Sequence, residues 1–321
     1  MSPATLQPST RRARLEALPG LTVRPGEPLA RRTTFRIGGP AELLVEVASQ
    51  RALMALLAVV RELEVPFCLV GLGSNLLAPD AGLPGVVAVL GGELRRVRVR
   101  GELVSAGGAL PLGLLAKRMA TRGLVGLEAL SGFPSTVGGA VFMNAGCYGT
   151  EIKDLLVAAT VVERGGRRRH LAPDELEAGY RSTVLQRTGA IVTRAVLRLR
   201  RGDAAAALRR IDELNAKRRA SLPSDRPNAG SIFKNPPGDY AGRLIEACGL
   251  KGAIAGGAQI SPKHANVIVN LGGAKATDVL ELMVRAREAV RTAFGVELEP
   301  EVVLAGDLQA SWRARAAAAT G

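Results

Sequence analysis

The pattern of apolar and polar positions predicts strands and helices along most of the chain. Between Ser49 and Glu64, leucines three and four positions apart fall on one helical face, and Ser49 is suited to cap that helix. Apolar runs at 41–47 and 66–70 flank this segment and predict two strands. The sequence therefore predicts a small α/β unit near the N-terminus.

Two further groups of elements follow. In the middle of the chain, a helix is predicted from Pro111 to Gly123, because proline suits the first helical turn and glycine the stop. The strands predicted around it are 86–90, 95–100, 102–106, 156–163, 168–171 and 190–199. The last part of the chain is predicted to contain helices at 204–219, 240–248 and 278–294 and strands at 265–270 and 296–304.

Two glycine-rich stretches interrupt the pattern. Gly71-Leu-Gly-Ser-Asn-Leu-Leu77 directly follows a predicted strand, and the segment 126–149 contains six glycines among apolar residues. Glycine lets backbone approach a ligand closely, and successive N–H groups can form a nest for a phosphate. The first stretch lacks the third glycine of the dinucleotide-binding fingerprint and is a weak signal alone. The second is too glycine-rich for an ordinary helix, and its density favours a cofactor-lining segment over a buried turn.

Composition narrows the function classes. A chain of 321 residues can bury a sizeable core and is expected to form two or three domains. Aromatic residues make up only 3%, which argues against a base-stacking surface for single-stranded nucleic acid. The net charge of +14 fits either a protein that binds a polyanion or an organism whose proteins are generally rich in arginine. We favour the second interpretation, because the arginines are scattered; steeply salt-dependent retention on DNA would favour the first.

The cysteines, the histidines and the terminal segments mainly argue against metal sites and membrane or secretory segments. Three separated cysteines and two histidines form no metal-ligand spacing, so we expect no metal and a reduced, cytoplasmic protein. No signal peptide and no bilayer-spanning stretch is expected. The arginine-rich segment 1–18 is predicted to be disordered, and the Ala/Arg-rich segment 307–321 to be disordered or loosely helical.

The glycine motifs together resemble a known enzyme family. Gly71–Leu77, Gly132-Phe-Pro-Ser-Thr-Val-Gly-Gly139 and Met143-Asn-Ala-Gly-Cys-Tyr-Gly149 are similar to motifs of the UDP-N-acetylenolpyruvoylglucosamine reductases, which make UDP-N-acetylmuramate for peptidoglycan. The resemblance extends from Thr34 to about Gly306. It implies an α+β fold, with an FAD-binding core of the vanillyl-alcohol-oxidase type in two subdomains and a C-terminal α+β substrate domain. The implied division is a tail at 1–18, FAD-binding subdomains at 19–84 and 85–202, a substrate domain at 203–306 and a tail at 307–321.

The resemblance also implies cofactors. FAD would be bound and NADPH would be the co-substrate that reduces it. The flavin N5 would pass a hydride to the vinyl carbon of UDP-N-acetylglucosamine enolpyruvate. The residues implied in FAD binding are Gly71, Gly73, Ser74, Asn75, Leu76, Ser131, Pro134, Ser135, Gly138, Gly139, Asn144, Gly146 and Ile191.

Three residues are candidates for catalysis. Ser231 would by itself be a turn residue, and with no histidine near in sequence a serine-hydrolase site has little support; the resemblance implies that it donates the proton. Arg181 could be a surface arginine, but a guanidinium can grip a carboxylate and stabilise an enolate, and the resemblance selects it for that role. By pattern alone Glu301 is one of three solvated glutamates with Glu297 and Glu299; the resemblance selects Glu301 as the catalytic carboxylate.

The substrate would be a small molecule bound by a monomer, without nucleic acid or membrane. The residues expected to contact it are Tyr180 and, for its diphosphate, Lys234, Asn235 and Lys263. The compact stretch from Arg181 to Ser231 is similar to the shorter, type II branch of the family. The alternative is a flavin oxidase of the same fold that acts on another alcohol or sugar and ignores NADPH.

The chain departs from the family pattern at a few positions. Thr33 stands where the family has asparagine, Ser135 where it has glycine, and Thr183 where it has serine two places after the arginine. Ser135 requires a backbone conformation that a residue with a side chain can adopt, so it tests the shape of the loop.

Overall fold

A computed structural model describes residues 8–318. Its chain divides into two compact units, which are described separately. The first contains the chain up to Pro25, Leu43–Leu72 and Gly85–Arg218; the second contains Gly26–Glu42, Gly73–Pro84 and the chain from Arg219 onward. No helix within residues 8–318 combines the length and apolar character needed to cross a bilayer.

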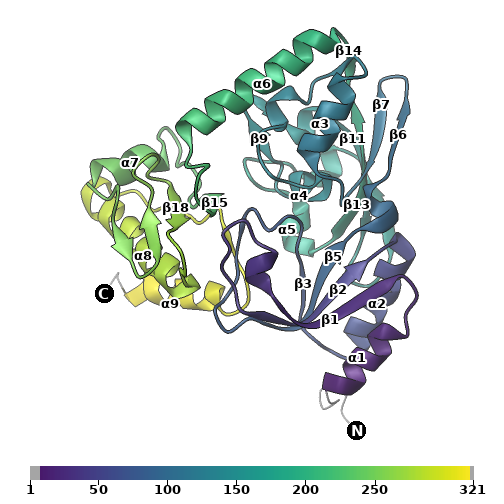
Figure 1. The fold of residues 1–321 in the computed structure, drawn as a ribbon, viewed down its shortest axis with the longest axis horizontal. Coiled ribbons are helices and arrows are strands. Elements are labelled where there is room, and N and C mark those ends of the chain that lie inside the picture. Colours follow the sequence, from purple (N-terminus) through teal and green to yellow (C-terminus); the bar gives the residue numbers. More distant parts are fainter. Residues whose placement is uncertain (1–7, 319–321) are drawn as a thin grey trace. The chain divides into compact units, whose positions relative to one another are not determined.

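A four-stranded sheet near the N-terminus has the strand order β1–β2–β5–β3 (Figure 1). Its strands are β1 (Leu21–Pro28), β2 (Pro40–Val47), β5 (Leu83–Leu90) and β3 (Phe67–Leu69). Helix α2 (Gln50–Glu62) packs its leucines against Val45, Val86 and Ala88. Ser49 caps this helix by accepting the N–H of Ala52 at 3.0 Å, which confirms the predicted start.

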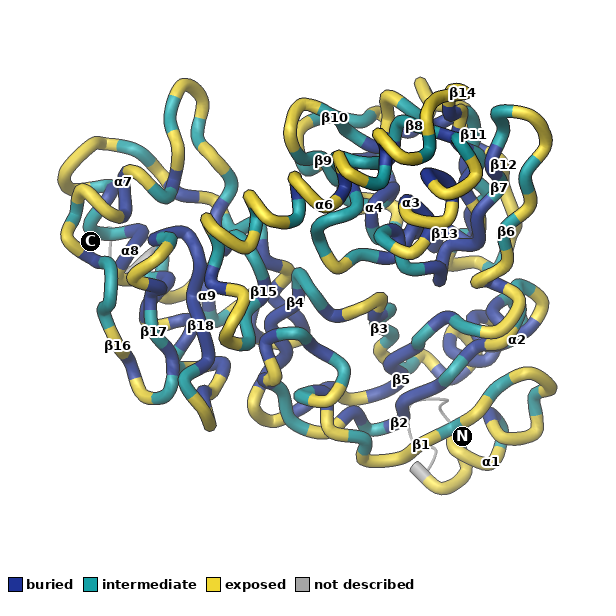
Figure 2. The backbone as a smooth tube through the Cα atoms, turned by 45° about the horizontal axis from the view of Figure 1, so that its top comes forward, coloured by how far each residue is buried: buried dark blue, intermediate teal, exposed yellow. Residues whose placement is uncertain are grey.

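A five-stranded antiparallel sheet forms the rest of the first unit. Its order is β12–β11–β13–β7–β6, with bounds β12 (Arg168–Leu171), β11 (Leu156–Val162), β13 (Ile191–Arg198), β7 (Leu103–Gly107) and β6 (Val97–Arg100). One face packs on α3 (Leu112–Ala120) and α4 (Val137–Phe142) through a fully buried apolar cluster. Figure 2 shows β13 as mostly buried.

The second unit is built on a small sheet of order β15–β18–β17–β16. Its strands are β15 (Asn228–Ser231), β18 (Val267–Asn270), β17 (Ala258–Ile260) and β16 (Ile254–Ala255). Helices α7 (Ala241–Ala247), α8 (Ala276–Phe294) and α9 (Leu308–Ala318) share one apolar cluster with this sheet and with Phe35 and Leu77.

The remaining elements are short or lie at the surface. The helices are α1 (Pro8–Glu16), α5 (Val184–Thr188) and α6 (Ala204–Ser221), and the 3₁₀ helices are η2 (Leu29–Arg31), η3 (Gly92–Arg95), η4 (Glu128–Leu130), η5 (Ile152–Asp154) and η6 (Asp174–Leu176). The two-residue strands are β4 (Leu76–Leu77), β8 (Leu124–Val125), β9 (Gly146–Cys147), β10 (Thr150–Glu151), β14 (Arg200–Arg201) and β19 (Val303–Leu304).

The structure corrects three expectations from the sequence. Segment 126–149 does contain a helix, α4, although only six residues long. The strand expected at 296–304 is reduced to β19, because Pro300 has no N–H to donate and pairs with Phe233 only as an isolated bridge. Segment 1–18, expected to be disordered, contains α1, which buries Leu15. In segment 307–321 the helical alternative is confirmed by α9, which buries Leu308 and Trp312 in the core; residues 1–7 and 319–321 lie outside the described part.

Candidate active site

The two glycine motifs meet at Thr136 in the first unit. An ideal Cβ at Gly71 would stand 3.3 Å from Thr136 Oγ1, and one at Gly139 would stand at the same distance from that oxygen. Thr136 caps α4 by accepting the N–H of Gly139 at 3.0 Å. Within residues 8–318, no acceptor receives the backbone N–H of Gly71 or Leu72. Two segments predicted to bind one cofactor are thus adjacent, and one of them offers open donors.

The serines of the second motif shape its backbone. Ser131 Oγ donates to Glu128 O at 2.8 Å, and Ser135 Oγ donates to Thr136 O at 2.9 Å. The backbone of Ser135 does not have a positive φ. The serine that replaces the family glycine is therefore not strained there. Pro134 directly precedes it. Gly138 is required by packing, because its Cβ would come within 2.9 Å of Gly108 O.

Asn144 organises the end of this segment. It is fully buried with φ of +42°, a conformation that asparagine tolerates better than most residues. Its Nδ2 donates to Glu151 Oε2 at 3.0 Å and to Gly179 O at 2.8 Å, and its Oδ1 accepts the N–H of Lys153. Asn144 therefore ties the glycine segment to the turn before Arg181.

Arg181 lies against the same segment. Its backbone has φ of +52°, its Nη2 donates to Gly146 O at 2.9 Å, and its guanidinium lies 5.0 Å from the centre of the Tyr180 ring. Thr183, which replaces the family serine, donates its hydroxyl to Phe142 O at 2.7 Å. The Thr183 hydroxyl therefore stabilises the turn that contains Arg181.

Glu151 is the carboxylate that accepts a hydrogen bond from Asn144. Burial raises the pKa of Glu151, but hydrogen bonds from Lys153 and Asn144, together with the charges of Lys153 and Arg181, outweigh burial and leave the pKa below its usual value. The carboxylate is therefore ionised at neutral pH and balances the positive charge of Arg181.

Ile191 lies in the core beside α2 and is only 2% exposed. Its predicted contact with the cofactor stays a prediction.

In the second unit, the rest of the first motif is held by the C-terminal chain. Gly73 has φ of +62°, and a Cβ there would come within 2.0 Å of Arg32 O. Asn75 Nδ2 donates to Glu301 O at 3.0 Å, and Asn75 O accepts the N–H of Val303. Leu76 pairs with Val303 in a parallel bridge, and Ser74 lies between the glycine and the asparagine.

Ser231 and Glu301 lie on adjoining backbone in the same unit. Ser231 is the last residue of β15 and pairs with Val267. The next residue, Ile232, accepts the N–H of Glu301 at 2.8 Å, and Phe233 forms a bridge with Pro300. Two residues 70 positions apart in sequence are thereby fixed side by side.

The three residues predicted to hold the diphosphate already have partners. Lys234 Nζ lies 3.1 Å from Glu299 Oε2, Asn235 Oδ1 accepts the N–H of Ala241 at the start of α7, and Lys263 Nζ donates to Arg219 O at 2.6 Å. The lysines would have to exchange these partners to bind phosphate, whereas Asn235 acts as a helix cap.

Sequence reasoning missed Asn266, which holds the backbone after Ser231. Asn266 is 3% exposed; its Oδ1 accepts the N–H of Phe233 at 2.9 Å and its Nδ2 donates to Phe233 O at 2.8 Å. His264 Nδ1 in turn accepts the N–H of Asn266 at 3.2 Å. Burial, followed by the nearby charge of Lys251, lowers the pKa of His264. Only the contact of Asn266 with Phe233, 33 residues away in the sequence, reveals this role.

The residues of the first unit fit a dinucleotide cofactor. The donors around Gly71 and Thr136 are backbone N–H groups and hydroxyls, which suit a pyrophosphate. Glycine at 71 and 139 keeps Cβ atoms away from Thr136, so the backbone there stays open to a ligand.

Comparisons with known proteins agree with this geometry. Residues 41–172 match a family model described as an FAD binding domain, and residues 222–305 match one described as the C-terminal domain of UDP-N-acetylenolpyruvoylglucosamine reductase. The chain is 49% identical over 284 residues to UDP-N-acetylenolpyruvoylglucosamine reductase 2 of Symbiobacterium thermophilum, covering 88% of this chain and 92% of that protein. It is 46% identical to the reductase of Rubrobacter xylanophilus, with 88% and 94% covered.

A solved structure gives the same result. The reductase of Thermus caldophilus matches with a TM-score of 0.78 and 41% identity, covering 89% of this chain and all of that one. The predicted fold class, with an FAD-binding core and a C-terminal α+β domain, is confirmed. The chain therefore belongs to the UDP-N-acetylenolpyruvoylglucosamine reductase family, as an FAD-binding oxidoreductase of peptidoglycan precursor synthesis.

Proposed function

We propose that the chain reduces UDP-N-acetylglucosamine enolpyruvate to UDP-N-acetylmuramate with NADPH as the electron source, and that Arg181, Ser231 and Glu301 carry the protein's part of the reaction. When bound, FAD supplies the hydride chemistry that no side chain provides. One vinyl carbon of the substrate gains a hydride, and its neighbour gains a proton.

Each of the three residues has a distinct task in this proposal. The Arg181 guanidinium binds the substrate carboxylate and stabilises the negative charge that develops beside it as the hydride arrives. Ser231 Oγ–H donates the proton that completes the product. Glu301 is the carboxylate that sets the protonation state around Ser231.

The observation that carries the proposal is the hydrogen bond from Glu301 N to Ile232 O at 2.8 Å. It fixes the proposed proton donor and the proposed carboxylate on adjoining backbone. Asn75, from the first glycine motif, holds the carbonyl of Glu301 in addition. A change at Asn75 would therefore reach the backbone of Glu301 through one hydrogen bond.

Replacing Ser231 by alanine tests the proton-donor role. Ser231→Ala should retain FAD and oxidise NADPH at the wild-type rate, but turnover of the enolpyruvyl sugar should fall by ~10²–10⁴-fold, the usual contribution of a general acid. Stopped-flow absorbance measures the two half-reactions separately.

Ser224→Ala is the matched control, because Ser224 is an exposed serine seven residues upstream. It should behave as wild type in both half-reactions. Normal turnover by Ser231→Ala would disprove the assigned role. Loss of flavin reduction in the same variant would indicate a damaged site instead.

The partner and location predictions belong to the same proposal. The chain acts on a small-molecule UDP-sugar. We propose in addition that it works as a cytoplasmic monomer that engages neither nucleic acid nor membrane. Light scattering and salt-dependent retention on DNA would test these points.

A further inference from the structure

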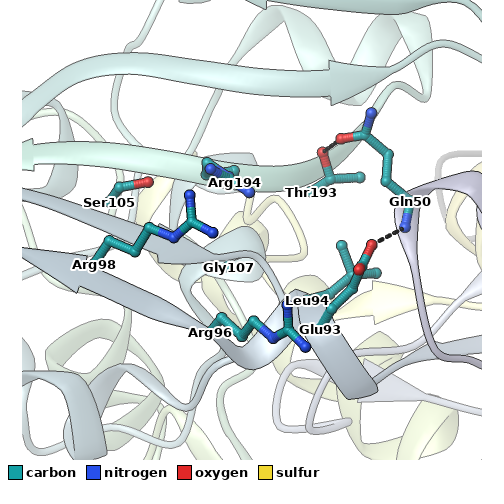
Figure 3. Close-up of a pocket in the computed structure, with 9 residues that line it drawn as sticks. All are labelled: Gln50, Glu93, Leu94, Arg96, Arg98, Ser105, Gly107, Thr193 and Arg194. Carbon is teal, nitrogen blue, oxygen red and sulfur yellow. Dashed lines mark hydrogen bonds between the residues drawn. The ribbon is translucent and has the colours of Figure 1, made fainter.

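A pocket opens on the face of the five-stranded sheet that is turned away from α3 and α4. Figure 3 shows the residues that line it. It has a volume of about 160 Å³ and lies in the first unit. Three arginines line it: Arg96 before β6, Arg98 on β6 and Arg194 on β13. The proposed function assigns no task to any of them.

Strand register places two of these arginines on either side of a glycine. Gly107 pairs with Arg194, and its N–H donates to Arg96 O at 2.9 Å. Directly paired residues of antiparallel strands project on the same face. Arg96, just before β6, thus forms a row with Gly107 on β7 and Arg194 on β13, and the middle residue of the row has no side chain. The backbone of Leu94 closes over the glycine, with Leu94 O only 2.0 Å from the position of an added Cβ.

The same strands contain a second row of residues, which does not line the pocket. Arg100 pairs with Leu103, and Leu103 pairs with Arg198, four residues further along each strand. The two arginines recur there, but a leucine fills the middle position. None of these three residues lines the pocket. The pocket therefore lies beside the glycine row, where the Leu94 backbone covers Gly107, and arginine content alone does not produce it.

The other polar groups of the pocket are mostly hydroxyls and an amide. Ser105 pairs with Arg98 on the same face. Figure 3 shows Gln50 between Thr193 and Glu93: its Oε1 accepts the Thr193 hydroxyl at 2.9 Å, and its N–H donates to Glu93 Oε1 at 3.1 Å. Glu93 is the one carboxylate in the lining, so three arginines and one glutamate give it a net charge of +2.

We infer that this pocket binds a phosphate-type oxyanion of inorganic size, such as pyrophosphate or the terminal phosphoryl group of a small metabolite. Arginine forks bind phosphate oxygens bidentately, and the like charges of Arg96 and Arg194, on either side of β7, repel each other until an anion neutralises them. The volume suits one or two phosphoryl groups and excludes a whole nucleotide. The inference is independent of the proposed function, since it uses no residue of the reductase site.

Calorimetric titration of the FAD-loaded protein with pyrophosphate at low ionic strength tests this inference. The double variant Arg96→Gln/Arg194→Gln should lose at least ten-fold in affinity for one binding equivalent. The matched control, Arg100→Gln/Arg198→Gln, removes the same charge from the same strands and should keep wild-type affinity. All four arginines are exposed, so neither variant disturbs the core.

Three results would overturn the inference. The wild-type protein could fail to bind pyrophosphate. Both double variants could lose affinity equally, which would indicate a general effect of net charge. The pocket variant could bind as tightly as wild type, which would place the anion elsewhere.

Discussion

At the scale of single residues, glycine has different physical roles at different positions. Gly73 and Gly101 have almost the same φ, +62° and +61°. A Cβ at Gly73 would collide with Arg32 O at 2.0 Å, whereas nothing lies within 4 Å of a Cβ at Gly101. The first glycine is required by close backbone packing and the second only by its dihedral angle.

This pair predicts unequal costs of adding one methyl group. Gly101→Ala should lower the free energy of unfolding by about 1–2 kcal/mol, the cost of a left-handed residue. Gly73→Ala should cost clearly more, because the backbone of Arg32 must also move. Circular dichroism in urea measures both variants, because Gly101 lies in the first unit. Trp312, the only tryptophan, lies in the unit of Gly73, so its fluorescence reports on Gly73→Ala separately. Equal midpoints for Gly73→Ala and wild type would contradict the packing argument.

His264 predicts a pH dependence of stability. Its pKa is lowered in the folded protein, mainly by burial and then by Lys251, so the unfolded state binds the proton more readily. The contribution is fully present above the unfolded pKa of about 6.5 and is lost as pH falls below it. Protonation of Nδ1 also removes the acceptor for the N–H of Asn266.

His264→Asn should flatten this acid-side loss of stability, because the asparagine oxygen can accept the same N–H without titrating. Urea midpoints measured between pH 7.5 and 5 provide the comparison. His170→Asn is the control, since it removes the other, exposed histidine without touching Asn266. An acid-side slope in His264→Asn as steep as in wild type would exclude His264 as its source.

At the scale of secondary-structure elements, α9 supports the adjoining backbone segments that carry Ser231 and Glu301. The family model for the C-terminal domain ends at residue 305, and α9 begins at Leu308. Trp312 is 6% exposed and its ring centre lies 6.2 Å from that of Phe233, which bridges to Pro300. Arg287 contacts the face of Trp312, pairs with Glu297 and donates to Ala316 O.

Trp312→Ala should therefore destabilise the second unit by about 3–5 kcal/mol, the usual cost of a buried tryptophan. Trp312→Phe keeps an aromatic ring beside Phe233 and should cost less. Circular dichroism in urea measures both, because the change removes the fluorophore. A loss of less than about 1 kcal/mol in the free energy of unfolding of Trp312→Ala would show that α9 does not stabilise the second unit.

Element prediction from sequence succeeded where the signal was local. The period of leucines and the Ser49 cap located α2 almost to the residue. Prediction was wrong for 296–304, where alternating burial of Leu298, Val302 and Leu304 is real but comes from irregular backbone around Pro300. It also underestimated the contribution of α9 to the core, because the one buried tryptophan of this helix stands among alanines and arginines.

At the scale of the whole chain, family motifs pointed to residues that periodicity could not connect. The bond from Asn75 to Glu301 spans 226 positions, and no hydrophobic period predicts such a pairing. The motifs nevertheless indicated both ends of it. Asn266 was not recognised, because its role lies in a contact with Phe233 and not in its own chemistry.

The central claim is that the protein is an FAD enzyme which takes electrons from NADPH and delivers them to the enolpyruvyl sugar. The most direct measurement is the visible absorption spectrum of the purified protein, recorded without oxygen before and after addition of NADPH. We predict flavin bands that bleach with NADPH and return when the enolpyruvyl sugar is added. Flavin bands that NADPH cannot bleach would contradict the claim and favour the oxidase alternative, and a protein that takes up no FAD would contradict the assignment of the glycine motifs.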